Sequence, residues 1–352
     1  MQLELLTIAI AYNKSIKIFF PTIKFLSSSM PIYGPDQINF AGVNGDRYWF
    51  YEPYPYTGIA NIDERLSSFP VAVFLPPHRP LQQTPLVIGL QGMSAPYGWN
   101  AFIVPTLTQM GIAVALFDTP FAGGRSLVRT FTATIQNEIQ PLIAQNISFD
   151  TALLLSIFRS TASNIASIHN FCGDRYHLSD RRLALFGVSM GVLLSAYAFT
   201  AKGLGDRLLG AIGHADLQSF ANSWGYWLLP DLAASPLGGF AVRLLTRLQP
   251  ELTPVVKLLQ LAKNLKYHDE YAWECNPMNY VEQVKLPRRV RFLVGANDPI
   301  VRVRDTRTCA EKFPDGACYI VPGMGHGTRQ WGPAFVDHVR YFLTTQLGDW
   351  QS

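Results

Sequence analysis

A serine in a glycine-flanked turn is the residue of this sequence best suited to nucleophilic chemistry. The segment 187–191 reads Gly-Val-Ser-Met-Gly, follows the apolar run 183–186 and precedes a helix-like stretch at 192–200. This context favours a nucleophile, because the tight turn strains the serine backbone and glycines relieve the crowding beside it. The N-terminus of the following helix stabilises negative charge formed there. We therefore predict that the Ser189 hydroxyl lies above a sheet edge as a nucleophile.

A serine hydroxyl needs a general base before it can attack a carbonyl carbon. Among the seven histidines, His326 lies in the glycine-rich loop 323–327, Gly-Met-Gly-His-Gly, directly after the last predicted strand. Such a loop lets an imidazole reach over the sheet edge towards Ser189. His214, which follows an earlier predicted strand, is the alternative base. We expect His326 to act as the base.

A carboxylate must then hold the imidazole in the correct tautomer. Asp298 follows the predicted strand 290–294 in the sequence Gly-Ala-Asn-Asp-Pro, and Asp216 follows the preceding strand as the alternative. An ordinary Asp-Pro turn is the plainer interpretation of Asp298. In chain order, Ser189, Asp298 and His326 each come after a separate strand, at the edge where open parallel sheets gather their ligands. We predict that these three side chains form a catalytic triad.

The negative oxygen of a tetrahedral intermediate needs two backbone N–H donors, and loss of one donor costs roughly 10²–10³ in rate. One expected donor is Met190, the residue after the nucleophile. The other is Met93, in the loop that follows the apolar run 86–90. Gly92 is expected to allow this loop to approach the nucleophile closely. These residues form the predicted oxyanion hole.

Short apolar runs alternate with helix-like stretches along most of the chain. Strands are predicted at 47–54, 69–75, 86–90, 111–117, 183–186, 208–212, 290–294 and 318–321. A long helix is predicted at 150–171. This alternation is typical of a parallel sheet covered by helices on both faces, so the predicted fold class is α/β.

An insertion at 218–275 separates two of the predicted strands. It contains an amphipathic helix that begins with Thr253 as its cap and Pro254 at its first helical position. An insertion over the carboxyl ends of the strands would be a lid. The alternative is a second packed helical layer with no role in binding.

Aromatic residues near these loops predict an apolar substrate pocket. We expect substrate-binding positions at Gly92, Tyr97 and Trp99 beside the oxyanion loop, and at Trp224 and Trp227 in the insertion. Packing in the core is the alternative interpretation of the aromatic side chains.

The composition indicates a well-packed globular protein without affinity for nucleic acid. Of 352 residues, 48% are hydrophobic and only 15% are charged, and the net charge of +4 is small and not clustered. The four cysteines lack C-x-x-C spacing, so no metal is expected. We expect free thiols in a reducing, cytoplasmic compartment, although Cys309 and Cys318 are close enough in sequence to bridge.

Membrane insertion is not expected, because no run reaches the roughly 18 apolar residues of a membrane span. Residues 1–30 mix lysines with apolar residues and could form an amphipathic surface helix. Packing on its own domain is the expected role of this segment, and contact with a membrane surface is the alternative. It lacks the basic start and the cleavage site of a secretory signal.

Over residues 46–352 the chain resembles the α/β-hydrolase superfamily. The matching features are the motifs around the three triad residues and the Gly-Gly-Arg-Ser loop after Asp118. Leu-Gln-Gly at 90–92 stands at the position where many members have His-Gly. The resemblance implies the α/β-hydrolase fold with an eight-stranded, mostly parallel sheet, a Ser–His–Asp triad and no cofactor. Two departures are Gln91 in place of the usual histidine and Val192 in place of a second glycine after the nucleophile turn.

The resemblance also implies a division of the chain. An N-terminal extension, 1–45, is expected to pack on a hydrolase core formed by 46–217 and 276–352, with a helical lid at 218–275.

The expected function is cleavage of a carboxylic ester, or a related acyl bond, in a moderately apolar small molecule through an acyl-enzyme on Ser189. The same triad would also serve a thioesterase, an acyltransferase or a carbon–carbon bond hydrolase. A ligand-binding protein without turnover is the alternative from a different class. No nucleic-acid partner, metal or cofactor is expected, and the sequence predicts no oligomeric state.

Overall fold

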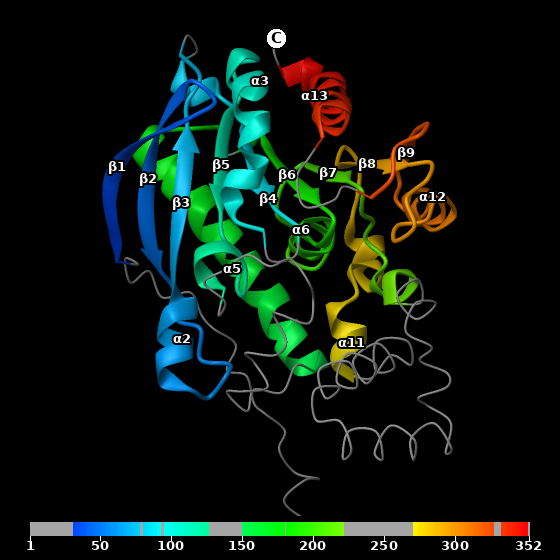
Figure 1. Cartoon of the computed structure of the whole chain (residues 1–352), viewed down its shortest axis with the longest axis horizontal. Helices are drawn as coiled ribbons and strands as arrows, with labels where there is room; N and C mark the ends of the chain where they lie inside the picture. Colours follow the sequence, from blue (N-terminus) through cyan, green and yellow to red (C-terminus); the bar gives the residue numbers. More distant parts are fainter. Residues whose placement is uncertain are drawn as a thin grey trace, which may run out of the picture. The chain divides into compact units, whose positions relative to one another are not determined.

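A nine-stranded sheet runs through the part of the chain that the computed structural model describes, namely residues 31–77, 80–92, 95–126, 150–179, 181–221, 270–326 and 332–350 (Figure 1). The strands are β1 (Ile32–Phe40), β2 (Val43–Tyr51), β3 (Ser68–Phe74), β4 (Leu86–Leu90), β5 (Ala113–Phe117), β6 (Leu183–Val188), β7 (Arg207–Ala211), β8 (Arg289–Gly295) and β9 (Gly316–Val321). The α-helices are α2 (Ala60–Ser67), α3 (Val104–Gln109), α5 (Thr151–Tyr176), α6 (Met190–Thr200), α11 (Glu270–Cys275), α12 (Val303–Glu311) and α13 (Pro333–Leu347). Short 3₁₀ helices are η1 (Leu81–Gln83), η2 (Tyr97–Ile103), η3 (Gly123–Arg125), η5 (Pro277–Gln283) and η6 (Gly348–Trp350).

The order of the strands places the candidate nucleophile near the centre of the sheet. The order is β1-β2-β3-β5-β4-β6-β7-β8-β9. Strands β5, β4, β6, β7, β8 and β9 are mutually parallel, whereas β1, β2 and β3 pair antiparallel and β3 is antiparallel to β5. The loops after β4, β6, β8 and β9 therefore emerge at one edge. The predicted α/β class is confirmed.

The central strands are continuous apolar runs because both of their faces are covered. Every residue of β4, β5, β6 and β7 is buried. Their positions match the predicted runs closely, and β6 extends two residues further, to Val188.

The described residues contain one strand more than the eight expected. This additional strand, β1, lies at the sheet edge, is mostly exposed and is rich in polar residues, so its sequence carries no buried-strand pattern. A two-residue turn joins it to β2, with positive φ at Ala41 (50°) and Gly42 (83°). Two positive φ angles are typical of the tight turns that fit the twist of a hairpin.

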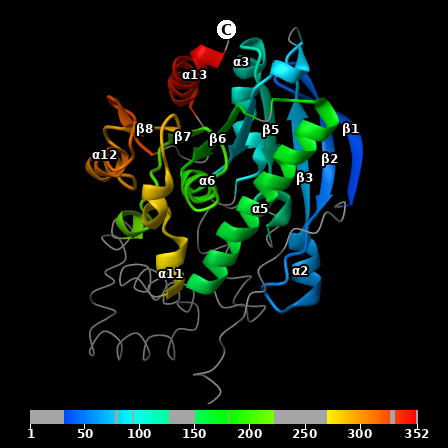
Figure 2. The same cartoon turned by 180° about the vertical axis from the view of Figure 1, so that it is seen from behind.

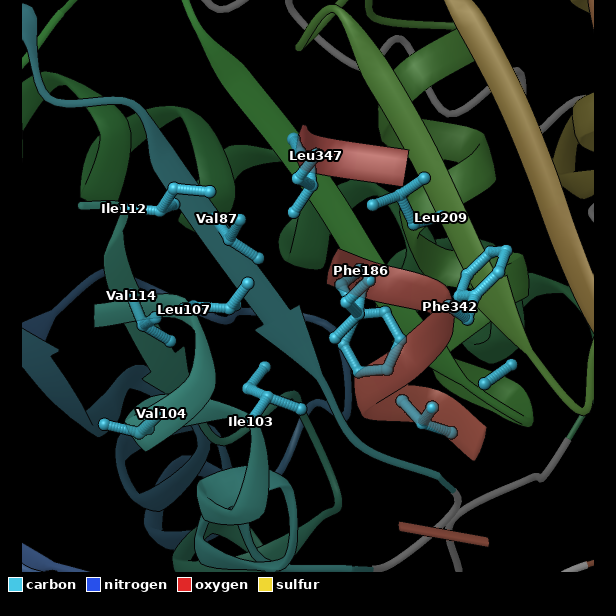
Figure 3. Packing of buried hydrophobic residues seen from close by; sticks show 14 of the residues in the cluster. Val87, Ile103, Val104, Leu107, Ile112, Val114, Phe186, Leu209, Phe342 and Leu347 are labelled. Atoms are coloured by element: carbon cyan, nitrogen blue, oxygen red, sulfur yellow. The ribbon is translucent and has the colours of Figure 1, made fainter. Parts of the chain in front are cut away.

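One face of the sheet packs against α3 and α13. Figure 3 shows Val87, Phe186 and Leu209, from β4, β6 and β7, directed towards Leu107 of α3 and Leu347 of α13. These side chains belong to a single cluster of buried residues. They hold the central strands in the order that positions the loops at the carboxyl edge.

Truncation of this cluster should destabilise the whole protein. Phe186 is 0% exposed, so we expect Phe186→Ala to lower the free energy of unfolding by about 3–5 kcal/mol, measured in urea. Tyr341→Ala on α13 is the matched control, because this aromatic side chain is 75% exposed and its loss should cost less than about 0.5 kcal/mol. Equal effects of the two substitutions would contradict this packing.

The opposite face is covered by α5 and α6, which lie in front of the sheet in Figure 2. In α6 every residue from Gly191 to Thr200 is buried, as expected of a helix enclosed between the sheet and α5. Asp150 caps α5 by accepting a hydrogen bond from Leu153 N–H (3.0 Å). The predicted helix 150–171 is therefore present and continues to Tyr176.

The segments at the domain boundaries are described in part. The sheet begins at Ile32, so residues 32–45 of the expected N-terminal extension form β1, the turn after it and the start of β2. Residues 1–30 and most of the expected lid, including Thr253, Pro254, Trp224 and Trp227, lie outside the described residues. The lid stays a prediction.

All four cysteines are free, as the sequence predicted; Cys172, Cys275 and Cys309 are buried, and Cys318 is half-buried. In the described ranges, no helix is long and apolar enough to cross a membrane.

Candidate active site

Ser189 occupies a strained turn between β6 and α6. Its φ is 53° and its ψ is −118°, outside the regions that residues with a side chain favour. A Cβ on Gly187 would lie 2.3 Å from the carbonyl oxygen of Gly191, and one on Gly191 would lie 2.5 Å from that of Leu90. Backbone atoms therefore exclude a side chain at either flanking position.

The imidazole of His326 reaches this serine from the loop after β9. The distance from Ser189 Oγ to His326 Nε2 is 3.1 Å. The other ring nitrogen, Nδ1, lies 2.9 Å from Asp298 Oδ2. The structure thus brings together three side chains that the sequence singled out.

Asp298 determines which nitrogen of His326 carries the proton. Its side chain is fully buried, and its Oδ1 accepts hydrogen bonds from the backbone N–H groups of Ile300 (2.9 Å) and Val301 (2.8 Å). The remaining oxygen, Oδ2, accepts from Nδ1–H, which leaves Nε2 free to accept the Ser189 proton. This is the tautomer that a general base requires.

The alternative base and acid are engaged elsewhere. His214 is 1% exposed, its Nδ1 accepts from the backbone N–H of Asp216 (3.2 Å), and burial lowers its pKa. The Asp216 carboxylate accepts from Gln218 N–H (3.1 Å) and from the Ser219 hydroxyl (2.8 Å). Among the described residues, neither side chain forms a hydrogen bond with Ser189.

The loop after β4 lies against the nucleophile turn. A Cβ on Gly92 would lie 3.6 Å from Ser189 Cβ, an ordinary contact, so glycine is not sterically required there by the described neighbours. The glycine that permits close approach is Gly191, because its Cβ would come within 2.6 Å of the Gln91 carbonyl oxygen. Met190 begins α6, and Met93 lies outside the described residues. Their role as oxyanion donors stays a prediction.

Of the expected aromatic pocket residues, Tyr97 and Trp99 are described, and both are half-buried in η2. The Tyr97 ring packs on Phe40 of β1, with centroids 5.9 Å apart. Trp99 N–H donates to the carbonyl oxygen of Pro96 (3.0 Å). Contact of either ring with a substrate stays a prediction.

The two departures from the superfamily motifs have different outcomes. Val192 is accommodated because two of its neighbours, Gly210 and Gly213, have no side chain. A Cβ on Gly210 would lie 2.7 Å from one Val192 methyl carbon, and a Cβ on Gly213 would lie 2.6 Å from the other. Gln91 is 1% exposed, and neither polar atom of its side chain has a hydrogen-bond partner in the described part of the chain.

Sequence reasoning missed Gly295, at the end of β8. A Cβ there would lie 2.1 Å from the carbonyl oxygen of Met324, which also accepts from Asn297 N–H (3.0 Å). Gly295 therefore lets the loops of Asp298 and His326 pack directly on each other. The only sequence signal is its position at the strand end before the acid.

We expect Gly295→Ala to displace the His326 loop. The added methyl group must push the Met324 carbonyl away, at a cost of about 1–3 kcal/mol in stability, and activity should fall at least about tenfold. Gly173→Ala, in open space on α5, is the control and should keep full activity. The measurements are thermal unfolding and ester turnover per folded protein. Full activity of Gly295→Ala would contradict this role.

The described residues contain no group of three or more His, Cys, Asp or Glu side chains that could hold a metal ion.

Comparisons with known proteins agree with this fold. Acetyl xylan esterase 1 from Thermoanaerobacterium sp. JW/SL YS485 is 16% identical, with 91% of this chain and 89% of that chain covered and a TM-score of 0.54. An acetyl xylan esterase from Paenibacillus sp. R4 is 13% identical, with 90% and 89% covered and a TM-score of 0.53. No protein-family model and no curated protein matches the sequence. At these identities the likeness shows the fold alone, which is the α/β-hydrolase fold.

Proposed function

We propose that this α/β-hydrolase-fold protein is a serine hydrolase that cleaves a carboxylic ester of a moderately apolar small molecule. The observation that carries the proposal is the pair of linked distances at the site. Ser189 Oγ is 3.1 Å from His326 Nε2, and His326 Nδ1 is 2.9 Å from Asp298 Oδ2. A hydroxyl, an imidazole and a carboxylate in this sequence of contacts form an activated nucleophile.

The proposed reaction proceeds by acyl transfer to water. Ser189 Oγ attacks the ester carbonyl carbon while its proton moves to His326 Nε2, and Asp298 stabilises the resulting imidazolium. The tetrahedral intermediate collapses, and the alcohol leaves with the proton from Nε2. Water, deprotonated by the same nitrogen, then attacks the acyl-enzyme and releases the acid and free Ser189.

Two backbone donors are proposed to hold the negative oxygen of each intermediate. The first proposed donor is Met190 N–H. Met190 is the first residue of α6, so the positive end of the helix dipole lies at the Ser189 turn. Met93 N–H is the second proposed donor, and its neighbours Gly92 and Ala95 are linked by a hydrogen bond from Ala95 N–H to the Gly92 oxygen (3.3 Å).

An ester is the favoured substrate class for two reasons. The solved structures with the same fold include proteins described as acetyl xylan esterases. The aromatic residues that the sequence has in the loop after β4 and in the insertion also favour a neutral, moderately apolar molecule over a charged one; they are Tyr97, Trp99, Trp224 and Trp227. A thioester or another acyl donor would use the same groups.

A fluorophosphonate probe and an ester panel test the proposal. We expect the probe to label Ser189, identified by peptide mass, and the protein to hydrolyse p-nitrophenyl esters of short acyl chains. A thioester and an added alcohol acceptor distinguish thioesterase and acyltransferase activity. A folded sample that neither takes up the probe nor turns over any acyl donor would instead be a ligand-binding protein.

A further inference from the structure

Two loops meet at the buried carboxylate of Asp118, directly after β5. The residue is 2% exposed. Its Oδ1 accepts a hydrogen bond from Tyr97 N–H (2.7 Å), and its Oδ2 accepts one from Gly124 N–H (2.8 Å). Because Tyr97 begins η2, these bonds join the loop after β4 to the loop after β5.

The loop after β5 is built around this carboxylate. Gly123 has a φ of 51°, and a Cβ there would lie 2.2 Å from Asp118 Oδ1. The buried guanidinium of Arg125 donates from Nη1 to the backbone oxygen of Asp118 (3.2 Å) and to Asn164 Oδ1 on α5 (2.8 Å). Arg125 therefore links Asp118 to α5.

On its other side, the loop after β4 packs on the nucleophile turn. The sheet order places β4 between β5 and β6. The carbonyl oxygens of Leu90 and Gln91 face Gly191 so closely that a Cβ there would lie 2.5 and 2.6 Å from them. Close packing holds this loop on the β6 side, and the bond to Asp118 holds it on the β5 side.

We propose that Asp118 is a positioning residue that holds the loop after β4 against the Ser189 turn in the geometry needed for acyl transfer. The proposal rests on the proposed hydrolase function. Asp118 acts through Tyr97 N–H and touches no reacting atom. A displacement of about 1 Å in such a loop costs on the order of 10²-fold in rate.

The ionised form of Asp118 is the one that both loops need. A carboxylate only accepts hydrogen bonds, whereas a protonated carboxyl would turn an O–H towards one of the two N–H donors. Burial raises the pKa of Asp118 to about 6, against the opposing effects of the two backbone bonds and the Arg125 charge. The Tyr97 phenol, beside Arg47 of β2, is the other titratable group near it.

The raised pKa of Asp118 has opposite consequences for the stability of the fold and for the activity. The pKa in the folded protein lies above the ordinary value of 3.8, so the group favours folding most at low pH and loses that contribution as the pH rises through about 6. Activity should follow the opposite course, because the ionised carboxylate anchors the loop. The molecule therefore keeps a buried charge that opposes folding at neutral pH.

Asp118→Asn is the direct test. The asparagine amide retains one acceptor oxygen but turns an N–H₂ group towards the second backbone donor, so one loop bond is lost. We expect kcat for p-nitrophenyl acetate to fall about tenfold to a hundredfold, with KM changed less than about threefold. Asp206→Asn is the matched control, because the Asp206 carboxylate accepts from Leu183 N–H (3.0 Å) at the opposite edge of the sheet. It should retain kcat.

The pH profile separates positioning from a general structural role. In the wild type, protonation of Asp118 should steepen the acid limb of kcat/KM near pH 6. In Asp118→Asn the acid limb should be less steep, and in Asp206→Asn it should keep the wild-type shape.

Hydrogen exchange of the peptide 90–99 provides a measurement that needs neither activity nor a variant. We expect its protection in the wild type, corrected for intrinsic exchange rates, to fall as the pH falls through about 6, and to be low at all pH values in Asp118→Asn. Unchanged protection, with kcat of Asp118→Asn equal to that of the control, would overturn the proposal. A wild type without esterase activity or probe labelling would refute the proposed function, and the exchange result would still decide whether Asp118 holds the loop.

Discussion

Replacing Ser189 with alanine is expected to lower kcat for ester hydrolysis by about 10⁴- to 10⁶-fold without unfolding the protein. In the proposed reaction, the acyl-enzyme forms on Ser189 Oγ. The substitution removes one oxygen and keeps the Cβ at the strained turn, where φ at Ser189 is 53°. The measurement is the burst and steady-state release of p-nitrophenol, with circular dichroism as the test of folding.

The control for this experiment is a serine of α6, the helix that follows the Ser189 turn. Ser195 is 0% exposed, and its hydroxyl has no hydrogen-bond partner within the described ranges. Ser195→Ala removes a buried unsatisfied polar group, so it should leave stability equal or higher and keep activity within about twofold. Activity of Ser189→Ala equal to that of Ser195→Ala would remove Ser189 from the mechanism.

Asp298→Asn is expected to lower kcat by about 10³- to 10⁴-fold through the tautomer of His326. The Ile300 and Val301 N–H groups donate to Oδ1, so the asparagine oxygen must occupy that position. The amide nitrogen then faces His326 Nδ1 as a donor. Nδ1 must accept, the ring proton moves to Nε2, and Nε2 can no longer take the Ser189 proton.

Ester turnover of Asp298→Asn is compared with that of Asp216→Asn, the alternative acid of the sequence. Asp216 binds Gln218 N–H and the Ser219 hydroxyl, so its loss should weaken that turn but leave kcat within about tenfold. The opposite ranking of the two variants would falsify the assignment of the acid. The tautomer itself can be read from the ¹⁵N shifts of the imidazole.

Local patterns carried most of the fold prediction. Burial on both faces makes the central strands continuous apolar runs, and helices have a different period, so β4 to β7 were readable from residue type alone. The edge strand β1 was not readable, because an exposed strand needs no apolar alternation. The local feature that marks the end of β1 is the tight turn at Ala41-Gly42.

By itself, the sequence determined the α/β class, the nucleophile turn and the order in which serine, acid and histidine follow their strands. These are properties of short segments, because a buried apolar run, a glycine-flanked turn and a strand end can each be recognised from a few neighbouring residues. Only the tertiary structure decided between Asp298 and Asp216 and between His326 and His214. The contact of Ser189 with His326 spans 137 residues, and strand order and loop packing set such contacts. The same holds for Gly295, Gly210 and Asp118, whose neighbours come from other loops and strands, so residue type and spacing could not reveal what each one touches.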